Sequence, residues 1–173
     1  MATTLVLYFS TSGTTKRMAQ TIANLTGADL HEIKAPDPYT QADLDWHDPQ
    51  SRTSIEQHEH QGHVACVNDF PALDQYDTII IGHPIWWGIP PRLIANAIDQ
   101  LPLDGKTLAT FATSGGSGYQ RSQSYIQFEH AFNQGSRNFS GAPFKFPGEM
   151  GVATSSAGRG SWFPLTYERK SLP

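Results

Sequence analysis

Three short apolar runs, each followed at once by a loop of small and polar residues, constrain the fold of this chain most strongly. They cover residues 5–9, 78–81 and 107–112. A run that is apolar at successive positions suits a strand buried on both faces, as in a parallel sheet. A sheet made of such strands needs helices on both of its faces.

Helical patterns lie between these runs. After Gly13, apolar residues recur with a helical period as far as Leu25, and Gly27 stands where a helix would end. A second apolar helical face covers residues 93–101, and residues 30–33 form a shorter, alternating strand candidate. Strands that alternate with helices indicate an α/β fold, and right-handed crossovers then favour a doubly wound parallel sheet.

Two segments depart from this pattern. A polar insertion at about residues 34–68 is rich in proline, aspartate and histidine. Residues 127–173 contain phenylalanines and repeated glycines, but show neither a helical nor a strand period. We therefore expect one domain over residues 1–126 and an atypical C-terminal segment in place of a clear fifth strand and last helix. The fourth strand is then expected to be a poorly covered edge.

The net charge of the chain and the lengths of its apolar segments limit the partners that it can bind. With 12 basic and 16 acidic residues, the net charge of −4 provides no electrostatic basis for binding nucleic acid or anionic membranes. No segment approaches the roughly 20 apolar residues of a membrane span. The single cysteine, Cys66, excludes an internal disulfide. We expect a cytoplasmic protein without membrane insertion.

A group of metal-capable side chains lies in the polar insertion. Structural zinc sites require strict ligand spacing and a partner cluster, and this group has neither. We interpret it as part of a solvated segment and expect no metal. Its members are His58, His60, His63 and Cys66.

The loop after the first apolar run suits a phosphate. Its glycine, Gly13, permits a tight turn before a helix whose free amides and dipole favour an anion. The loop matches neither a Walker nor a dinucleotide-binding pattern, so a terminal monophosphate held by neutral donors fits better. The candidate ligands are Ser10, Thr11, Ser12, Gly13, Thr14 and Thr15.

The loop after the second run carries two tryptophans between glycines and prolines. One indole can stack on a flat heteroaromatic ring while the other packs beneath the loop, and we favour Trp87 for the ring. A flexible peptide at Gly88 can turn toward that ring. The candidate binding residues here are Pro84, Trp86, Trp87 and Gly88.

The loop after the third run offers backbone amides at close approach, which suits the polar edge of such a ring. Its candidates are Thr113, Ser114, Gly115, Gly116, Ser117 and Gly118. The carboxyl ends of parallel strands meet at one edge of a sheet, where ligands bind. The three loops together therefore predict a monophosphate whose other end is a flat ring.

These segments resemble the flavodoxin family, particularly its short members. The resemblance rests on residues 8–15, 82–88 and 111–118 and runs from about residue 3 to residue 125. It implies a flavodoxin-like sheet with strand order 2-1-3-4-5 and flavin mononucleotide (FMN) as cofactor. The first loop would bind the FMN phosphate, the second would cover one face of the isoalloxazine ring, and the third would contact its edge.

Three functions stay open at this point. The first is electron transfer between redox partner proteins, and the second is an FMN-dependent oxidoreductase that uses a nicotinamide cofactor and a quinone-like acceptor. The third is a non-catalytic flavin-binding or interaction module. None of them requires a catalytic side chain, because the redox chemistry belongs to the flavin. A homodimer is compatible with each.

Overall fold

The structure is a computed structural model that describes residues 3–58, 64–133, 143–146, 150–156 and 163–166. Its strands are β1 (Thr4–Tyr8), β2 (Asp29–Glu32), β3 (Thr78–Pro84), β4 (Thr107–Thr113), β5 (Pro143–Phe146), β6 (Met150–Ser156) and β7 (Phe163–Thr166). Its helices are α1 (Thr14–Thr26), α2 (Arg52–His58), α3 (Leu93–Gln100) and α4 (Gln120–Asn133).

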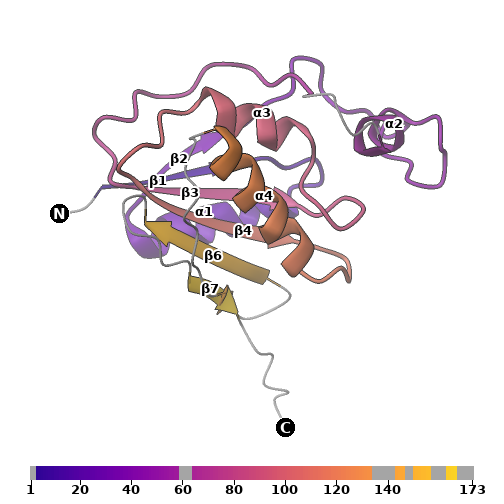
Figure 1. The fold of residues 1–173 in the computed structure, drawn as a ribbon. Helices are drawn as coiled ribbons and strands as arrows, with labels where there is room; N and C mark the ends of the chain where they lie inside the picture. Colours follow the sequence, from indigo (N-terminus) through magenta and orange to yellow (C-terminus); the bar gives the residue numbers. More distant parts are fainter. Residues whose placement is uncertain (1–2, 59–63, 134–142, 147–149, 157–162, 167–173) are drawn as a thin grey trace, which may run out of the picture.

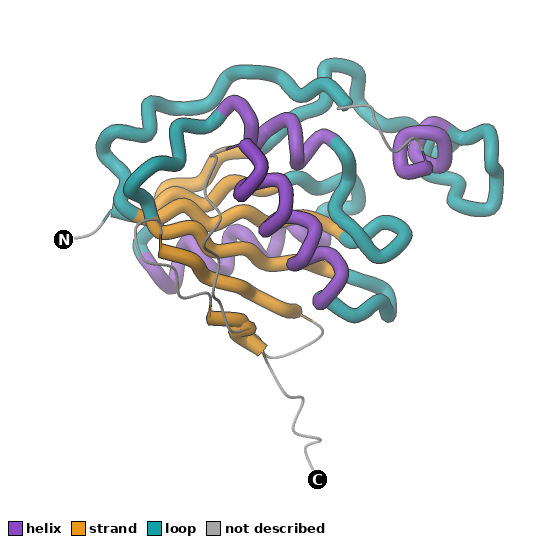
Figure 2. Tube along the Cα trace, in the orientation of Figure 1, coloured by secondary structure: helices purple, strands orange, loops and turns teal. Residues whose placement is uncertain are grey.

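The first four strands form a parallel sheet in the order β2-β1-β3-β4. Helix α1 covers one face of this sheet, while α3 and α4 lie together on the other (Figures 1 and 2). The predicted doubly wound α/β fold and the order 2-1-3-4 are therefore confirmed.

Alternate residues of β1 enter two separate cores, which explains why the strand is apolar throughout. Leu5 and Leu7 pack in the larger core with the apolar face of α3. Val6 and Tyr8 pack in the smaller core with the buried residues of α1, Ala19 among them. The carboxyl ends of β1, β3 and β4 are thereby held side by side.

Helix α1 begins and ends where its glycines predict. Gly13 precedes it with a φ of 83°, and Gly27 follows it with a φ of 67°. Both values lie in the left-handed region that glycine enters without a steric penalty. The amide of Gly27 closes the helix by donating to the carbonyl of Ala23.

The expectation that β4 is a poorly covered edge is wrong. Strand β6 pairs with β4 in the antiparallel direction, with Thr107 opposite Ser156 and Phe111 opposite Val152. The fifth place in the sheet thus holds an antiparallel strand, and β5 and β7 follow it in the order β4-β6-β5-β7. Pairing satisfies the backbone donors and acceptors that an open edge would expose.

Strands β5 and β6 form an antiparallel hairpin. Residues 147–149 alone separate the two strands, and a link of that length allows only an antiparallel pair between them. Helix α4 extends beyond residue 126 to Asn133, into the segment for which no helical period was expected.

Gly82 has no room for a side chain. It lies opposite Phe111 in the β3–β4 pair, and a methyl group on Gly82 would come within 2.1 Å of the Phe111 ring. We predict that Gly82→Ala lowers the free energy of unfolding by about 2–3 kcal/mol through overpacking. Urea denaturation measures this change.

The matched control is Gly118→Ala, because a methyl group there meets no atom within 4 Å. Equal stabilities of the Gly82→Ala variant and the unmodified protein would contradict the close packing of Gly82 on Phe111.

Candidate functional site

The three loops predicted to bind a ligand meet at the carboxyl edge of the parallel sheet. Thr113 joins them: its hydroxyl lies 2.7 Å from the hydroxyl of Thr15 in the first loop. Its carbonyl accepts a 2.9 Å hydrogen bond from the amide of Ile85 in the second loop. The amide of Phe9 also donates to the carbonyl of Gly82 at 2.9 Å. The loops are therefore positioned by one another as well as by the strands.

The first loop presents the start of α1 without a side-chain cap. The hydroxyl of Ser10 accepts a 3.1 Å bond from the amide of Gly13, which shapes the turn from within. The first turn of the helix contains no acidic residue. Free amides at a helix start, with neutral hydroxyls and no carboxylate, make a site that fits a phosphate dianion.

The hydroxyls of the first loop divide into two groups. Thr11, Ser12 and Thr14 are exposed, and the hydroxyl of Ser12 donates to that of Thr14 at 3.2 Å. Thr15 is buried, and its hydroxyl bonds to Thr113. The exposed group can face a ligand, whereas Thr15 ties the first loop to the third.

The second loop contains a tight reversal at its tryptophans. Trp86 and Ile89 exchange two backbone hydrogen bonds, of 2.9 and 3.1 Å. The residues between them both have positive φ, 51° at Trp87 and 84° at Gly88, as a type I′ turn requires. A bulky residue at positive φ is strained, and such strain is concentrated at ligand sites.

The two indoles have different surroundings. Trp86 packs against the larger core, with edge contacts to Phe9 at 5.8 Å and Tyr39 at 5.4 Å between ring centroids. Trp87 contacts the ring of His58 at 5.7 Å. Trp86 is therefore the indole that packs, partly buried, against the larger core, and any contact of its ring with a ligand stays a prediction. The assignment of Trp87 to a ligand ring stays a prediction.

The third loop is organised by its serine. The hydroxyl of Ser114 accepts hydrogen bonds from the amides of Gly116, at 3.1 Å, and Ser117, at 2.6 Å. Gly115 and Gly118 are exposed and meet no neighbouring atom where a side chain would begin. The loop therefore keeps an open surface of backbone beside the tryptophan turn.

Sequence reasoning missed Gln57, which fastens the polar insertion to the second loop. Its side-chain amide donates to the carbonyls of Trp86, at 3.1 Å, and Pro90, at 3.2 Å. Its side-chain oxygen accepts from the amide of Arg92 at 3.1 Å. Gln57 thus contacts both sides of the strained turn. No local signal marks it, because its partners lie about thirty residues away along the chain.

Arg92 continues this network behind the turn. Its guanidinium donates to the carbonyl of Gln57 at 3.1 Å and to the hydroxyl of Tyr125 at 2.9 Å. Arg92 is buried, and within the described ranges its Nε has no hydrogen-bond partner. The insertion, α3 and α4 are therefore joined at one point next to the tryptophans. Figure 1 shows α2 standing beyond the carboxyl ends of the strands.

The insertion corrects one interpretation of the sequence. Cys66 is not solvated: it is buried in the larger core and accepts a 3.2 Å bond from the side chain of Gln100. His58 donates from Nδ1 to the carbonyl of Ser54 at 2.6 Å. His60 and His63 lie outside the described residues. Among the residues that are described, no group of His, Cys, Asp or Glu could hold a metal ion.

His83 lies at the base of the second loop and is fully buried. Its Nδ1 lies 2.9 Å from the carbonyl of Pro84, and its ring stacks on Tyr119. Burial lowers the pKa of His83 from 6.5 to about 4, so the ring is neutral at pH 7. A neutral ring donates from Nδ1 to the Pro84 carbonyl and supports the loop without adding charge.

The fold and its edge thus define an α/β protein with three loops gathered around the uncapped start of α1. The family model for flavodoxin matches residues 3–134. The chain therefore belongs to the flavodoxin family. Within the described part of the chain, no helix is long and apolar enough to cross a bilayer.

Solved structures support the same relationship. A protein from Bacteroides eggerthii, classed as a flavoprotein, is 40% identical and has a TM-score of 0.72, covering 74% of this chain and 80% of that one. A flavoprotein from Lactobacillus acidophilus, solved in complex with FMN, is 29% identical and has a TM-score of 0.63. That match covers 75% of this chain and 87% of the other.

A further relative is an enzyme. An NAD(P)H dehydrogenase (quinone) from Acidovorax ebreus is 27% identical over 190 residues. The match covers 97% of this chain and 90% of that protein.

Loss of the Gln57 side-chain amide removes the bonds that the Pro90 carbonyl and the Arg92 amide make to it, while the Trp86 carbonyl keeps its bond from the Ile89 amide. We predict that Gln57→Met, of similar volume, lowers the free energy of unfolding by about 3 kcal/mol, because buried unsatisfied groups cost about 1–3 kcal/mol each. Urea denaturation followed by tryptophan fluorescence measures it. Gln50→Met, at an exposed position of the same insertion, is the control. Identical losses in both variants would show that Gln57 does not fasten the turn.

Because its pKa is lowered in the folded protein, His83 makes the free energy of unfolding fall as the pH falls below 6.5. Below pH 6.5 the unfolded chain binds a proton at this histidine while the folded chain does not, down to about pH 4. We predict that His83 reduces the free energy of unfolding by at most about 1.4 kcal/mol for each unit by which the pH falls in this window. His83→Asn, which keeps a donor for Pro84, should therefore show a shallower decline from pH 6.5 to pH 4. Parallel declines in both proteins would refute the assignment.

Proposed function

We propose that this chain binds FMN at the carboxyl edge of its sheet and uses it in electron transfer. The single observation that carries the proposal is the convergence of the three loops on Thr113, which places the start of α1 beside the tryptophan turn. A phosphate site and a ring site on one edge suit a mononucleotide. The FMN complex of the relative from Lactobacillus acidophilus supports this choice.

The first loop is proposed to hold the phosphate. The amides that begin α1 and the exposed hydroxyls of Thr11, Ser12 and Thr14 would supply neutral donors. Ser10 and Thr15 would act indirectly, because their hydroxyls already bond to Gly13 and Thr113. The proposed FMN-binding unit is residues 1–126.

The second and third loops are proposed to hold the ring. Trp87 would cover one face of the ring, since Trp86 packs against the core. The peptides at Gly88 and along residues 113–118 would approach the ring edge, where glycine leaves the backbone uncovered. When bound, FMN would supply the electron chemistry, and the protein groups near its ring would set the potential.

A second candidate function is reduction of a quinone-like acceptor by a nicotinamide cofactor. The observation that favours it is the quinone dehydrogenase from Acidovorax ebreus, because the match extends over nearly the whole of both chains. Anaerobic mixing of the FMN-loaded protein with NADH or NADPH, followed by a quinone, separates this enzyme from a pure electron carrier.

We predict that the protein binds FMN and that Thr113→Val weakens the affinity about fivefold. The substitution keeps the shape but removes the hydroxyl that joins the first and third loops, and one neutral hydrogen bond contributes about 1 kcal/mol. Titration of FMN fluorescence measures both affinities. Stacking on an indole should quench that fluorescence.

The matched control is Thr107→Val, the same substitution at the opposite end of β4. A protein that shows no flavin absorption after addition of FMN and gel filtration would overturn the proposed function. Equal affinities of the Thr113 and Thr107 variants would overturn the role of Thr113 alone.

A further inference from the structure

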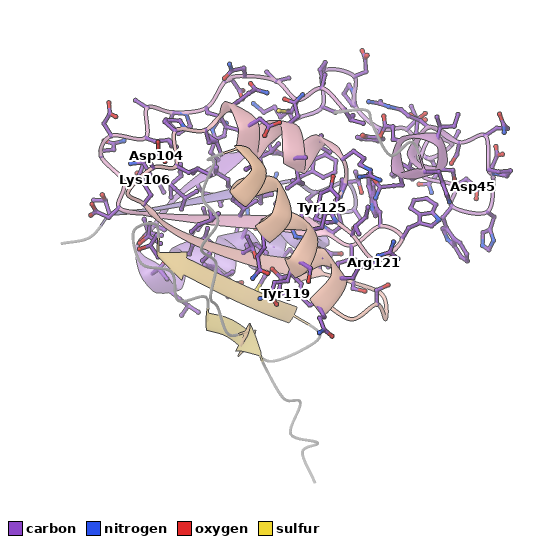
Figure 3. All side chains as sticks on the ribbon, viewed as in Figure 1. Asp45, Asp104, Lys106, Tyr119, Arg121 and Tyr125 are labelled. Carbon is purple, nitrogen blue, oxygen red and sulfur yellow. The ribbon has the colours of Figure 1, made fainter. Side chains whose placement is uncertain are left out.

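Arg121 reaches from α4 to the tryptophan turn. It is the second residue of the helix that follows the third loop, and Figure 3 places it beside the loops at the carboxyl edge. A methyl group in place of a Gly88 hydrogen would lie 3.4 Å from Cδ of Arg121 and 3.5 Å from one of its terminal nitrogens. The side chain of Arg121 therefore lies against Gly88 of the second loop, next to the position proposed for the ring.

The charge of Arg121 has no counterpart nearby. Within the described ranges its guanidinium makes no hydrogen bond or ion pair, and the first turn of α4 contains no acidic residue. The other guanidinium close to this turn, that of Arg92, is buried and directed to Gln57 and Tyr125 instead. Among the described residues, Arg121 is thus an exposed cation without an ion-pair partner, beside Gly88 of the turn.

We propose that Arg121 raises the affinity of the site for reduced FMN relative to oxidised FMN, because it stabilises the reduced ring. This inference rests on the proposed function, since it requires FMN at the carboxyl edge. Two electrons and one proton added to the oxidised ring give a reduced ring with one negative charge. A guanidinium against the Gly88 peptide attracts that charge and leaves the neutral oxidised ring almost unaffected.

The exposure of Arg121 limits the size of the effect. Water and salt screen the charge of an exposed cation. Arg121 should therefore favour the reduced ring over the oxidised ring by about tenfold in affinity, and not by a thousandfold or more. The same reasoning makes the preference sensitive to ionic strength. A group that only shaped the loops would not show that sensitivity.

The test compares four proteins: unmodified, Arg121→Gln, Arg121→Lys and Lys106→Gln. Lys106→Gln removes the same charge at the opposite edge of the sheet, where Lys106 donates to the carbonyls of Leu73 and Tyr76. Figure 3 shows Lys106 and Arg121 far apart at the two ends of the sheet. The affinity for oxidised FMN comes from fluorescence titration. The midpoint potential comes from equilibration with a reference dye during slow reduction by dithionite.

Arg121→Gln should weaken binding of reduced FMN about tenfold relative to oxidised FMN, which lowers the two-electron midpoint potential by about 30 mV. Arg121→Lys should retain most of the preference because it retains the charge. Lys106→Gln should leave the potential unchanged. The difference between the Arg121→Gln variant and the unmodified protein should shrink in 1 M NaCl.

The possible failures are distinct. If Arg121→Gln weakens both oxidation states equally, or raises the potential, Arg121 does not select the reduced ring and the inference is overturned. If Lys106→Gln shifts the potential as much as Arg121→Gln, net charge rather than position is responsible, which also overturns it. If the unmodified protein binds no FMN, the proposed function fails and this inference fails with it.

Discussion

The backbone and hydroxyl of Thr113 hold together the edge on which the rest of the site depends. The residue ends β4, yet its two polar groups bond to the loops that follow β1 and β3. Parallel pairing brings three strand ends to one edge, but it does not by itself determine how the loops beyond them are arranged. The bonds of Thr113 supply that arrangement, and so determine the spacing between the proposed phosphate site and the proposed ring site.

The tryptophan turn shows how a strained segment is maintained. Positive φ at Trp87 is unfavourable for a bulky side chain, and the turn persists because its surroundings restrict it. Gln57 bonds to both sides of the turn, and the partly buried ring of Trp86 packs against the core. The polar insertion is therefore part of the architecture of the site, although most of its surface faces solvent.

The buried polar groups that hold the tryptophan turn depend on one another for their hydrogen bonds. Arg92 is removed from water with one nitrogen unpaired among the described residues, and this arrangement is tolerable only while Gln57 and Tyr125 remain in place. The neutral ring of His83 adds a further buried support below the same turn. The edge thus combines buried supports with an exposed cation beside the turn, Arg121, whose charge is proposed to act on a ligand.

Much of the fold and part of the site were determined by the sequence alone, because their signals are local. Continuous apolar strands, the glycines at both ends of α1, and the hydroxyl-rich first loop act through neighbouring residues, so they can be recognised without a structure. Only the tertiary structure decided that Trp86 enters the core, that β6 pairs antiparallel with β4, and that Gln57 and Arg121 reach the tryptophan turn. These contacts join residues distant in the chain, and their existence depends on how whole elements pack rather than on any local pattern.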